Sequence, residues 1–346
     1  MGVFKNKDIG DFKERTKYGN IADSFTKNTQ DFLLIYSPTS LSKIEFTAQT
    51  AKNKISTREL SKDVNALDEA IAKIPPHINQ IISIGGGTAI DIGKYIAYKT
   101  QEKMVAIPSM LSTNVYATSK VALILNGQKI TLPAKMPDKI LVDKDFIEKS
   151  SKFNLYGLAD IFSIYTALRD WQLASEIGKE DINSKIYTKA QDLFKEALNF
   201  VLNNSLTEIE KNVKKIYEIV GDAGLITNEY GTGRPESGSE HILAKEIEHN
   251  INIYHGISVS VSVIIMSLIQ NRPHETLYRC LSKIGVLDNL AERGITREIL
   301  LKILENLKAR PDRYSIVNTY SRDTNFLSDI LDKYEHIIDG GGYVNY

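Results

Sequence analysis

The first 150 residues alternate between short apolar runs and polar stretches with helical spacing, and this alternation restricts the chain to a few architectures. Residues 32–36, 80–84 and 104–107 are apolar runs that end at Ser-Pro, at a row of glycines and at a proline, respectively. Residues 90–99, between the second and third runs, have helical periodicity. Strand, helix and strand in this order is typical of parallel βαβ units.

Two further apolar runs predict a hairpin. Residues 121–125 and 129–132 flank Asn126-Gly127, and Asn-Gly between β-forming runs favours a tight two-residue turn. Residues 139–143 are expected to form one more strand.

Strand patterns end near Phe153, and long helical patterns follow. They cover about 156–176, 181–203, 206–227, 237–248 and 256–270, with several more towards Asp332. A chain of 346 residues suits two domains. We therefore predict an α/β nucleotide-binding domain over 1–150 and an all-helical domain over 151–346.

The charge balance gives no electrostatic reason to expect nucleic acid or an anionic membrane as a partner, because Lys plus Arg equals Asp plus Glu at 43 each. Cys280 is the one cysteine, which excludes an intrachain disulfide and a cysteine-rich zinc site. The first residues lack an apolar signal core, and the longest apolar run, 257–269, contains four serines and is short for a membrane span. We expect a cytoplasmic protein without membrane insertion.

Three glycines stand where the strand at 80–84 gives way to a helix: Gly85, Gly86 and Gly87. Glycines there let the backbone approach a ligand, and a helix N-terminus offers free N–H groups to a phosphate. The alternative is a tight turn before a helix capped by Thr88, with Asp91 completing a capping box. Three successive glycines exceed what a turn needs, so we favour binding of a pyrophosphate, although the pattern is not G-x-G-x-x-G.

An aspartate and two histidines predict a metal site. Asp160 is expected near the start of a helix, on its apolar face, where an unpaired carboxylate is costly. His241 and His255 each lie beside an expected helix start. Each residue alone has a structural alternative, such as a helix cap or a salt bridge. Together, one carboxylate and two imidazoles suit a three-ligand site with an open position, for zinc first and for iron, nickel or manganese as alternatives.

The glycine segment resembles the cofactor motif GGG-x-x-x-D-x-x-K of the superfamily that holds iron-containing alcohol dehydrogenases, glycerol dehydrogenases and dehydroquinate synthases. The resemblance implies a Rossmann-like N-terminal domain and an all-α C-terminal domain, as in dehydroquinate synthase. It also implies NAD or NADP as cofactor. The segment 107–114 resembles a second cofactor stretch of that superfamily. The implied cofactor-binding residues are Gly85, Gly86, Gly87, Asp91, Lys94, Ser109, Ser112 and Thr113.

The C-terminal half resembles the glycerol-1-phosphate dehydrogenases within that superfamily. Residues 157–160 and 170–174 resemble their G-x-x-D and D-W-x-L-A stretches, and residues 233–241 resemble S-R-P-x-S-G-S-E-H. Residues 254–256 and 313–316 are similar to two shorter motifs, L-H-G and R-Y-T-I-L. The resemblance implies that Asp160, His241 and His255 are the metal ligands and take part in catalysis.

The chain departs from this family at Asn114, where an aspartate is expected to accept a hydrogen bond from a substrate hydroxyl. Asn114 keeps a carbonyl acceptor but loses the charge and adds donors. Tyr116 and Lys120 are also unusual there. Lys120 has two open readings, contact with an anionic substrate or exposure to water. The strand end Tyr36-Ser37 has no acidic residue for the adenosine ribose, so NAD and NADP both remain open.

The resemblance implies a metal-dependent, NAD(P)-linked oxidoreductase that interconverts a small polyol or polyol phosphate, like glycerol 1-phosphate, and its ketone, like dihydroxyacetone phosphate. We also expect a homo-oligomer. One alternative is a lyase resembling dehydroquinate synthase, although the substrate-binding stretch of those enzymes is not evident and they carry Glu at the position of Asp160. Another alternative is a non-catalytic nucleotide-binding protein, which the presence of all three ligand types disfavours.

Overall fold

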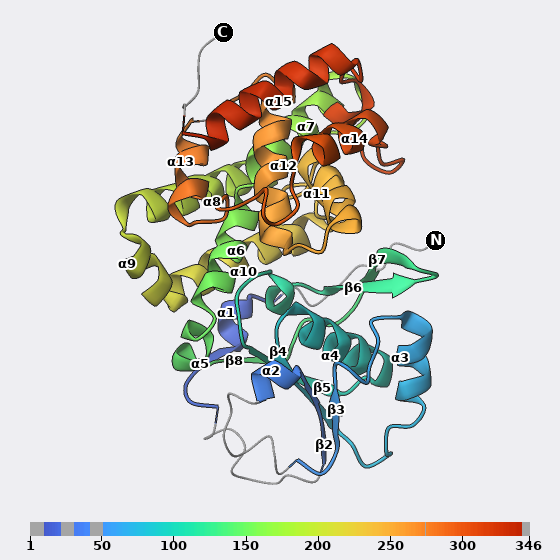
Figure 1. Ribbon diagram of the computed structural model, residues 1–346. Helices are drawn as coiled ribbons and strands as arrows, with labels where there is room; N and C mark the ends of the chain where they lie inside the picture. Colours follow the sequence, from blue (N-terminus) through green and yellow to red (C-terminus); the bar gives the residue numbers. More distant parts are fainter. Residues whose placement is uncertain (1–9, 22–30, 42–50, 274, 341–346) are drawn as a thin grey trace. The chain divides into compact units, whose positions relative to one another are not determined.

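The computed structural model describes residues 10–21, 31–41, 51–273 and 275–340 (Figure 1). The chain forms two compact units. The first comprises Met1–Asn154 and Glu210–Asn228, and the second comprises Leu155–Ile209 and Glu229–Tyr346. The N-terminal residues on which the expectation of no signal segment depends lie outside the described ranges. Within those ranges, no helix is both long enough and apolar enough to cross a membrane.

The first unit is built on a six-stranded sheet in which every pair of neighbouring strands is parallel. The strand order is β1-β8-β5-β4-β2-β3. The chain runs from β2 outward to β3 on one side, and from β4 through β5 to β8 on the other. The two directions diverge at the β2–β4 pair, which is where ligands bind doubly wound sheets. The strands are β1 (Thr16–Tyr18), β2 (Phe32–Tyr36), β3 (Lys54–Ser56), β4 (Gln80–Gly85), β5 (Lys103–Pro108) and β8 (Lys139–Val142).

The predicted parallel strands and the predicted hairpin are confirmed. Strands β6 (Lys120–Leu125) and β7 (Gln128–Pro133) form a separate antiparallel pair. Asn126 and Gly127 at the turn have φ of 52° and 76°. Positive φ at both central residues is the reason that Asn-Gly suits this turn.

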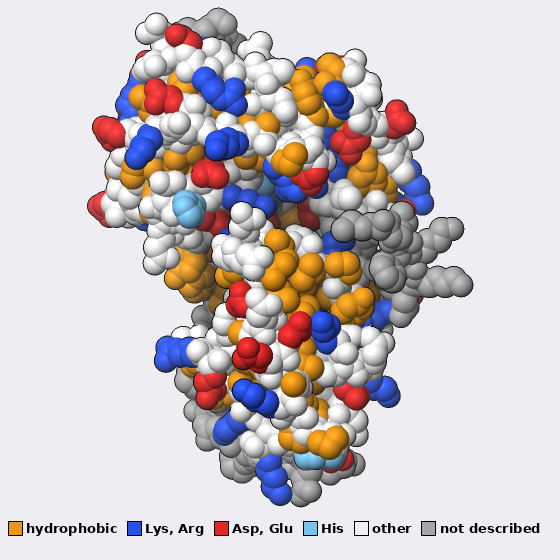
Figure 2. Space-filling view, turned by 90° about the vertical axis from the view of Figure 1, so that its right-hand side faces the viewer, with side chains coloured by type: hydrophobic (Ala, Val, Ile, Leu, Met, Phe, Trp, Pro, Cys, Tyr) orange, Lys and Arg blue, Asp and Glu red, His pale blue; other side chains and the backbone are white. Residues whose placement is uncertain are grey.

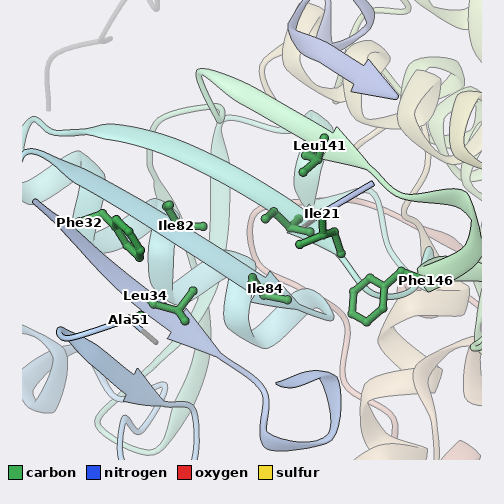
Figure 3. Packing of buried hydrophobic residues seen from close by; sticks show 9 residues of the cluster. Ile21, Phe32, Leu34, Ala51, Ile82, Ile84, Leu141 and Phe146 are labelled. Carbon is green, nitrogen blue, oxygen red and sulfur yellow. The ribbon is translucent and has the colours of Figure 1, made fainter. Parts of the chain in front are cut away.

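Apolar side chains from neighbouring strands pack together at the centre of this sheet (Figure 3). Leu34, Ile84 and Leu141 project from different strands, and Phe146 joins them from α5 (Lys144–Glu148). Helix α4 (Gly87–Thr100) packs against β4 and β5. The shorter helices of this part of the unit are α1 (Phe12–Arg15), α2 (Pro38–Leu41), α3 (Val64–Ile71) and η2 (Val115–Ala117).

The first unit also includes most of α10 (Val213–Tyr230), which is remote in sequence. The rings of Tyr116 and Tyr217 stack with centroids 4.7 Å apart, and Phe12 meets both edge-on. A Cβ on Gly221 would lie 2.2 Å from the Phe12 ring. Gly221 therefore leaves the space that the Phe12 ring occupies, and this aromatic cluster joins α10 to the N-terminal segment.

The second unit is helical among its described residues, as expected for the C-terminal part of the chain. Its main helices are α6 (Ser151–Ile161), α7 (Ile164–Glu176), α8 (Ser184–Asn203), α9 (Leu206–Lys211), α11 (Ser239–Asn250), α12 (His255–Ile269), α13 (Glu275–Lys283), α14 (Arg297–Asn306) and α15 (Thr324–Ile338), with the 3-10 turn η3 (Ile316–Asn318). Helix α6 begins in the last residues of the first unit. Cys280 lies buried in α13.

Two of the long helices predicted from periodicity are divided. The predicted helix 156–176 is interrupted at Phe162-Ser163, and 206–227 is interrupted at Asn212. Asn212 accepts a hydrogen bond from the backbone N–H of Lys215, so it caps the second of the two helices that it separates.

On the face of the molecule drawn in Figure 2, Lys and Arg side chains are intermixed with Asp and Glu side chains.

Candidate metal centre and cofactor turn

The three predicted metal ligands come from three helices of the second unit. Asp160 is the second-last residue of α6, His241 is the third residue of α11, and His255 is the first residue of α12. The expectation that Asp160 lies near a helix start was wrong. The predicted helix is interrupted at Phe162-Ser163, so Asp160 lies near the end of α6, and α7 begins after the interruption. The two histidines do lie at helix starts, as predicted.

The ligand atoms of these side chains converge. The Nε2 atoms of His241 and His255 lie 3.3 and 3.6 Å from Oδ1 of Asp160. One ligand atom from each residue lies within 4.8 Å of the other two. Two ligands bound tetrahedrally at the usual zinc distances are separated by about 3.3 Å. The spacing of these atoms therefore fits three ligands around one small ion.

The environment of Asp160 Oδ1 also suits a bound metal ion. This oxygen is buried and makes no well-formed hydrogen bond with the residues that the structure describes. A buried carboxylate oxygen without a donor is costly, and a cation between it and the two imidazoles would remove that cost. One oxygen and two imidazole nitrogens suit zinc or another transition-metal ion better than magnesium or calcium, which favour oxygen ligands.

A carboxylate holds each histidine ring from behind. Nδ1 of His241 lies 2.8 Å from Oε1 of Glu240, and Nδ1 of His255 lies 2.6 Å from Oε1 of Glu248. Ser258 Oγ also donates to Glu248 Oε1, at 2.9 Å. A carboxylate at Nδ1 fixes the ring and its tautomer, so that Nε2 is available as a ligand. Neither Glu240 nor Glu248 was predicted from the sequence to take part in this site.

The charges of the centre are coupled. Burial would lower the pKa of His241, but its polar contacts with Asp160 and Glu240 and the charges of both carboxylates outweigh burial and raise that pKa to about 10. Burial would raise the pKa of Asp160, but the close contact with His241 Nε2 and the charges of both histidines lower it. Without a metal ion, this centre is therefore an ion pair, and a metal ion would replace the His241 proton.

The glycine turn lies in the first unit, at the carboxyl ends of β2, β4 and β5. Gly85 has φ of +154°, and a Cβ there would lie 2.8 Å from the Ala89 Cβ. A Cβ on Gly86 would lie 3.2 Å from Sδ of Met110, and one on Gly87 would lie 3.2 Å from Oγ1 of Thr113. The turn is therefore packed closely against the segment that follows β5, and no side chain of its own covers its backbone.

The expectation that Thr88 caps the following helix was wrong. Helix α4 has Gly86 as its N-cap and no side-chain cap hydrogen bond. Asp91 does not complete a capping box. Its Oδ2 lies instead 3.1 Å from Nζ of Lys62. The first N–H groups of α4 therefore have no capping side chain among the described residues.

Lys94 is fully buried in the next turn of α4, and its Nζ points to the chain after Asn114. It donates to Val115 O at 2.8 Å, Thr118 Oγ1 at 3.0 Å and Lys120 O at 2.5 Å. Burial lowers the pKa of Lys94 to about 8, although the charge of Asp91 opposes this shift. Its contacts are with this segment rather than with the glycine turn.

The segment after β5 carries the remaining predicted site residues. Ser109 is buried and accepts a hydrogen bond from Ser40 Oγ at 3.0 Å, and its N–H donates to Gly85 O. Ser112, Thr113 and Asn114 are partly exposed. Asn114 precedes the 3-10 turn η2 and forms no side-chain cap with it. The structure thus brings Ser109 to Gly85 and Thr113 to Gly87, and it joins Asp91 and Lys94 to other partners.

The sequence and the fold are similar to those of known proteins. Residues 14–150 match the model of a family described as iron-containing alcohol dehydrogenase. Over 252 residues the chain is 32% identical to glycerol-1-phosphate dehydrogenase [NAD(P)+] of Methanococcus aeolicus, covering 68% of this chain and 73% of that protein.

Solved structures of low sequence identity share the fold. A probable glycerol dehydrogenase from Sinorhizobium meliloti superposes with a TM-score of 0.67 at 15% identity, covering 92% of this chain and 94% of that one. Sulfoacetaldehyde reductase from Bifidobacterium kashiwanohense, solved in complex with NAD+, gives a TM-score of 0.65 at 15% identity, covering 94% and 97%.

Proposed function

This chain belongs to the glycerol-1-phosphate dehydrogenase family of iron-containing alcohol dehydrogenases, and from that premise we propose that it is a metal-dependent, NAD(P)-linked dehydrogenase of a small polyol or polyol phosphate. The reaction is the reversible oxidation of a secondary alcohol to a ketone. The observation that carries the proposal is the convergence of Asp160 Oδ1 with the Nε2 atoms of His241 and His255.

Asp160, His241 and His255 would hold the metal ion. Bound there, a divalent ion would supply Lewis acidity to the oxygen of the alcohol or ketone. The protein contributes the arrangement of the ligands. Glu240 and Glu248 keep a proton on each Nδ1, so that both Nε2 atoms are directed at the same point as Asp160 Oδ1.

The glycine turn would hold the pyrophosphate of the cofactor. Gly85, Gly86 and Gly87 have no side chains of their own beside their backbone N–H groups, and the N-terminus of α4 adds the favourable end of its dipole. Ser109, Ser112 and Thr113 follow the adjacent strand β5, and Thr113 lies beside Gly87. Asp91 and Lys94 would support this region from behind.

The substrate class rests on the relatives, whose names specify glycerol 1-phosphate or glycerol. Asn114 would contact a substrate hydroxyl, accepting a hydrogen bond through its carbonyl and donating through its amide. An aspartate at this position could only accept when ionised. Asn114 is therefore the residue through which this chain would differ from its relatives in substrate preference.

The direct test is the oxidation of NADH and NADPH by the purified protein with dihydroxyacetone phosphate or dihydroxyacetone, followed by absorbance. We expect steady consumption of one cofactor, loss of turnover after chelation, and recovery on metal add-back. Because a dehydroquinate synthase-like lyase regenerates its NAD within each turnover, it would show no net consumption. Full activity after chelation would contradict the metal-dependent mechanism.

Three finer points are part of the same proposal. Zinc is the proposed ion, with iron, nickel and manganese as the alternatives that elemental analysis would distinguish. The choice between NAD and NADP would follow from the rates with each reduced cofactor. A homo-oligomer is proposed for the assembled protein, and light scattering at several protein concentrations would test it.

A further inference from the structure

We propose that Asp170, a fully buried residue of α7, is a positioning residue that fixes the start of α11 and thereby the place of His241. The inference rests on the proposed metal centre and adds to it a residue with no atom at the metal. Asp170 is ten residues after Asp160 in the chain, but its carboxylate contacts the segment that carries His241.

The Asp170 carboxylate joins three segments of the second unit. Oδ2 accepts a hydrogen bond from the backbone N–H of Ser239 at 2.5 Å. Oδ1 accepts from the N–H of Ile316 at 2.8 Å and from Gln270 Nε2 at 3.0 Å. These donors belong to the start of α11, the start of η3 and the C-cap of α12. Both carboxylate oxygens are therefore satisfied by groups that are distant in sequence.

The contact with Ser239 replaces the missing cap of α11. The N-cap residue of this helix is Gly238, and it forms no side-chain cap hydrogen bond. Ser239 is the first helical residue, and Asp170 satisfies its N–H, which would otherwise be an unpaired donor in the protein interior. A carboxylate at a helix N-terminus is also favoured by the helix dipole. His241 follows two residues later, so its backbone position depends on this cap.

The glycine before this helix is explained by the same contact. A Cβ on Gly238 would lie 2.5 Å from Oδ2 of Asp170 and 2.9 Å from Cα of Ala167. The start of α11 therefore approaches α7 so closely that only glycine fits at this position. Two segments singled out in the sequence, 170–174 and 233–241, thus meet at one contact.

Helix α7 supports the other side of the same turn through Thr166, one helical turn before Asp170. Thr166 Oγ1 donates to Oε2 of Glu240 at 2.7 Å. Glu240 Oε1 accepts from the N–H of Gly238 at 2.5 Å and contacts the His241 ring. One face of α7 therefore holds the backbone of this turn through Asp170, and the ring of His241 through Thr166 and Glu240.

The test is Asp170→Asn, which keeps the size of the side chain and replaces one acceptor oxygen with an NH2 donor. That NH2 would face either the Ser239 N–H or the donors at Oδ1, so at least one hydrogen bond is lost. We expect affinity for Zn²⁺, measured by competition with a chelator, to fall 10- to 100-fold, as for other residues that orient metal ligands. We also expect a changed visible absorption spectrum of the Co²⁺-loaded protein.

The matched control is Asp143→Asn in the first unit. Asp143 is also a buried carboxylate that accepts backbone hydrogen bonds, from Ile21 at 2.9 Å and Phe146 at 3.0 Å. This substitution should lower the unfolding temperature but leave Zn²⁺ affinity and the Co²⁺ spectrum as in the wild type. If Asp170→Asn behaves like this control, Asp170 has only a structural role and the inference is wrong.

Two further outcomes are informative. If Asp170→Asn does not fold, Gln270→Leu removes one donor from Oδ1, and an unchanged Zn²⁺ affinity in that variant would overturn the inference. If the wild-type protein itself binds no Zn²⁺ or Co²⁺, the proposed metal centre fails and the inference fails with it. That result differs from a failure of the inference alone, which requires a metal-binding wild type.

Discussion

The metal centre and the glycine turn achieve their expected binding by opposite means. At the metal centre, a glutamate carboxylate contacts Nδ1 of each histidine, and the Thr166 hydroxyl donates to one of these glutamates, Glu240. The glycine turn offers backbone atoms, and its closeness to Met110 and Thr113 depends on missing side chains. A metal ion needs a few atoms at fixed distances, whereas a pyrophosphate needs N–H groups that nothing covers. The first site should therefore be sensitive to loss of side chains, and the second to their addition.

The largest effect is expected for His255→Ala. Removing one of three ligands should abolish stoichiometric metal content and lower kcat/KM by about 10³-fold or more, because Lewis-acid stabilisation is worth several kcal/mol. Elemental analysis and steady-state kinetics measure both. His249→Ala, an exposed histidine of α11, is the control and should retain metal and activity. An active, metal-free His255→Ala protein would contradict the ligand assignment.

Adding a side chain to the glycine turn should have the next largest effect. Gly86→Val should weaken NAD(P)H binding by at least about 2 kcal/mol, comparable to lost charge-assisted hydrogen bonds. Fluorescence titration with NADH and NADPH measures the change. Metal content should stay as in the wild type, which separates the two sites. If the folded variant binds NAD(P)H with wild-type affinity, the pyrophosphate does not bind at this turn.

Glu248→Gln tests whether the carboxylate behind a ligand matters as much as we expect. Loss of the charge at Nδ1 of His255 should lower metal affinity about 10-fold, at the lower end of the range for such groups. Glu246→Gln, an exposed residue of the same helix, provides the control. Equal affinities in the two variants would mean that Glu248 does not hold the ring of His255.

Lys94 gives the first unit a dependence on pH. The pKa of Lys94 is about 8 in the folded protein, below the ordinary 10.5. Burying the charged side chain therefore lowers the free energy of unfolding below pH 8, and this loss disappears as the pH rises towards 10.5. The wild type should therefore gain stability relative to Lys94→Met by up to about 1.4 kcal/mol per pH unit in that window. Urea unfolding at pH 7.5 and 9.5 checks the sign. A constant difference would place the folded pKa near the ordinary value.

Asn114→Asp should have the smallest effect on binding and the most specific one. We expect the ratio of rates with dihydroxyacetone phosphate and dihydroxyacetone to change several-fold, since one strong hydrogen bond is worth about 1 kcal/mol. Cofactor affinity should stay nearly intact. An unchanged substrate profile would place Asn114 away from the substrate.

The features predicted correctly are those encoded locally. The apolar runs at 32–36 and 80–84 and the Asn-Gly turn carry their own signals, and the structure confirms them. Strands β1 and β3 were missed because each has only three residues, and their pairing with β8 and β2 makes them strands. The break before α7 was missed because apolar spacing continues through Phe162 without a glycine or proline. Its support is tertiary, since Ser163 Oγ donates to Glu236 O.

The candidate site shows the same division. Asp160, His241 and His255 were singled out by residue type and then by resemblance, whereas their convergence depends on the fold. Glu248 could have been found earlier, because it lies seven residues after His241, on the same face of one helix. Thr88 was wrongly predicted as the N-cap because threonine often has that role, whereas α4 already begins at Gly87 and has Gly86 as its N-cap. The partners of Lys94 lie more than twenty residues away, and no local pattern indicates them.

The clustering of Phe12, Tyr116 and Tyr217 has a consequence for biosynthesis. Residues 155–209, which belong to the second unit, separate the two parts of the first unit in the chain. A ribosome makes the sheet early, but the ring that stacks on Tyr116 is added about a hundred residues later. The aromatic cluster of the first unit can therefore form only after residues 155–209 of the second unit have been translated. Contacts of such long sequence separation slow folding, so a nascent chain would expose the Tyr116 surface to chaperones during this interval.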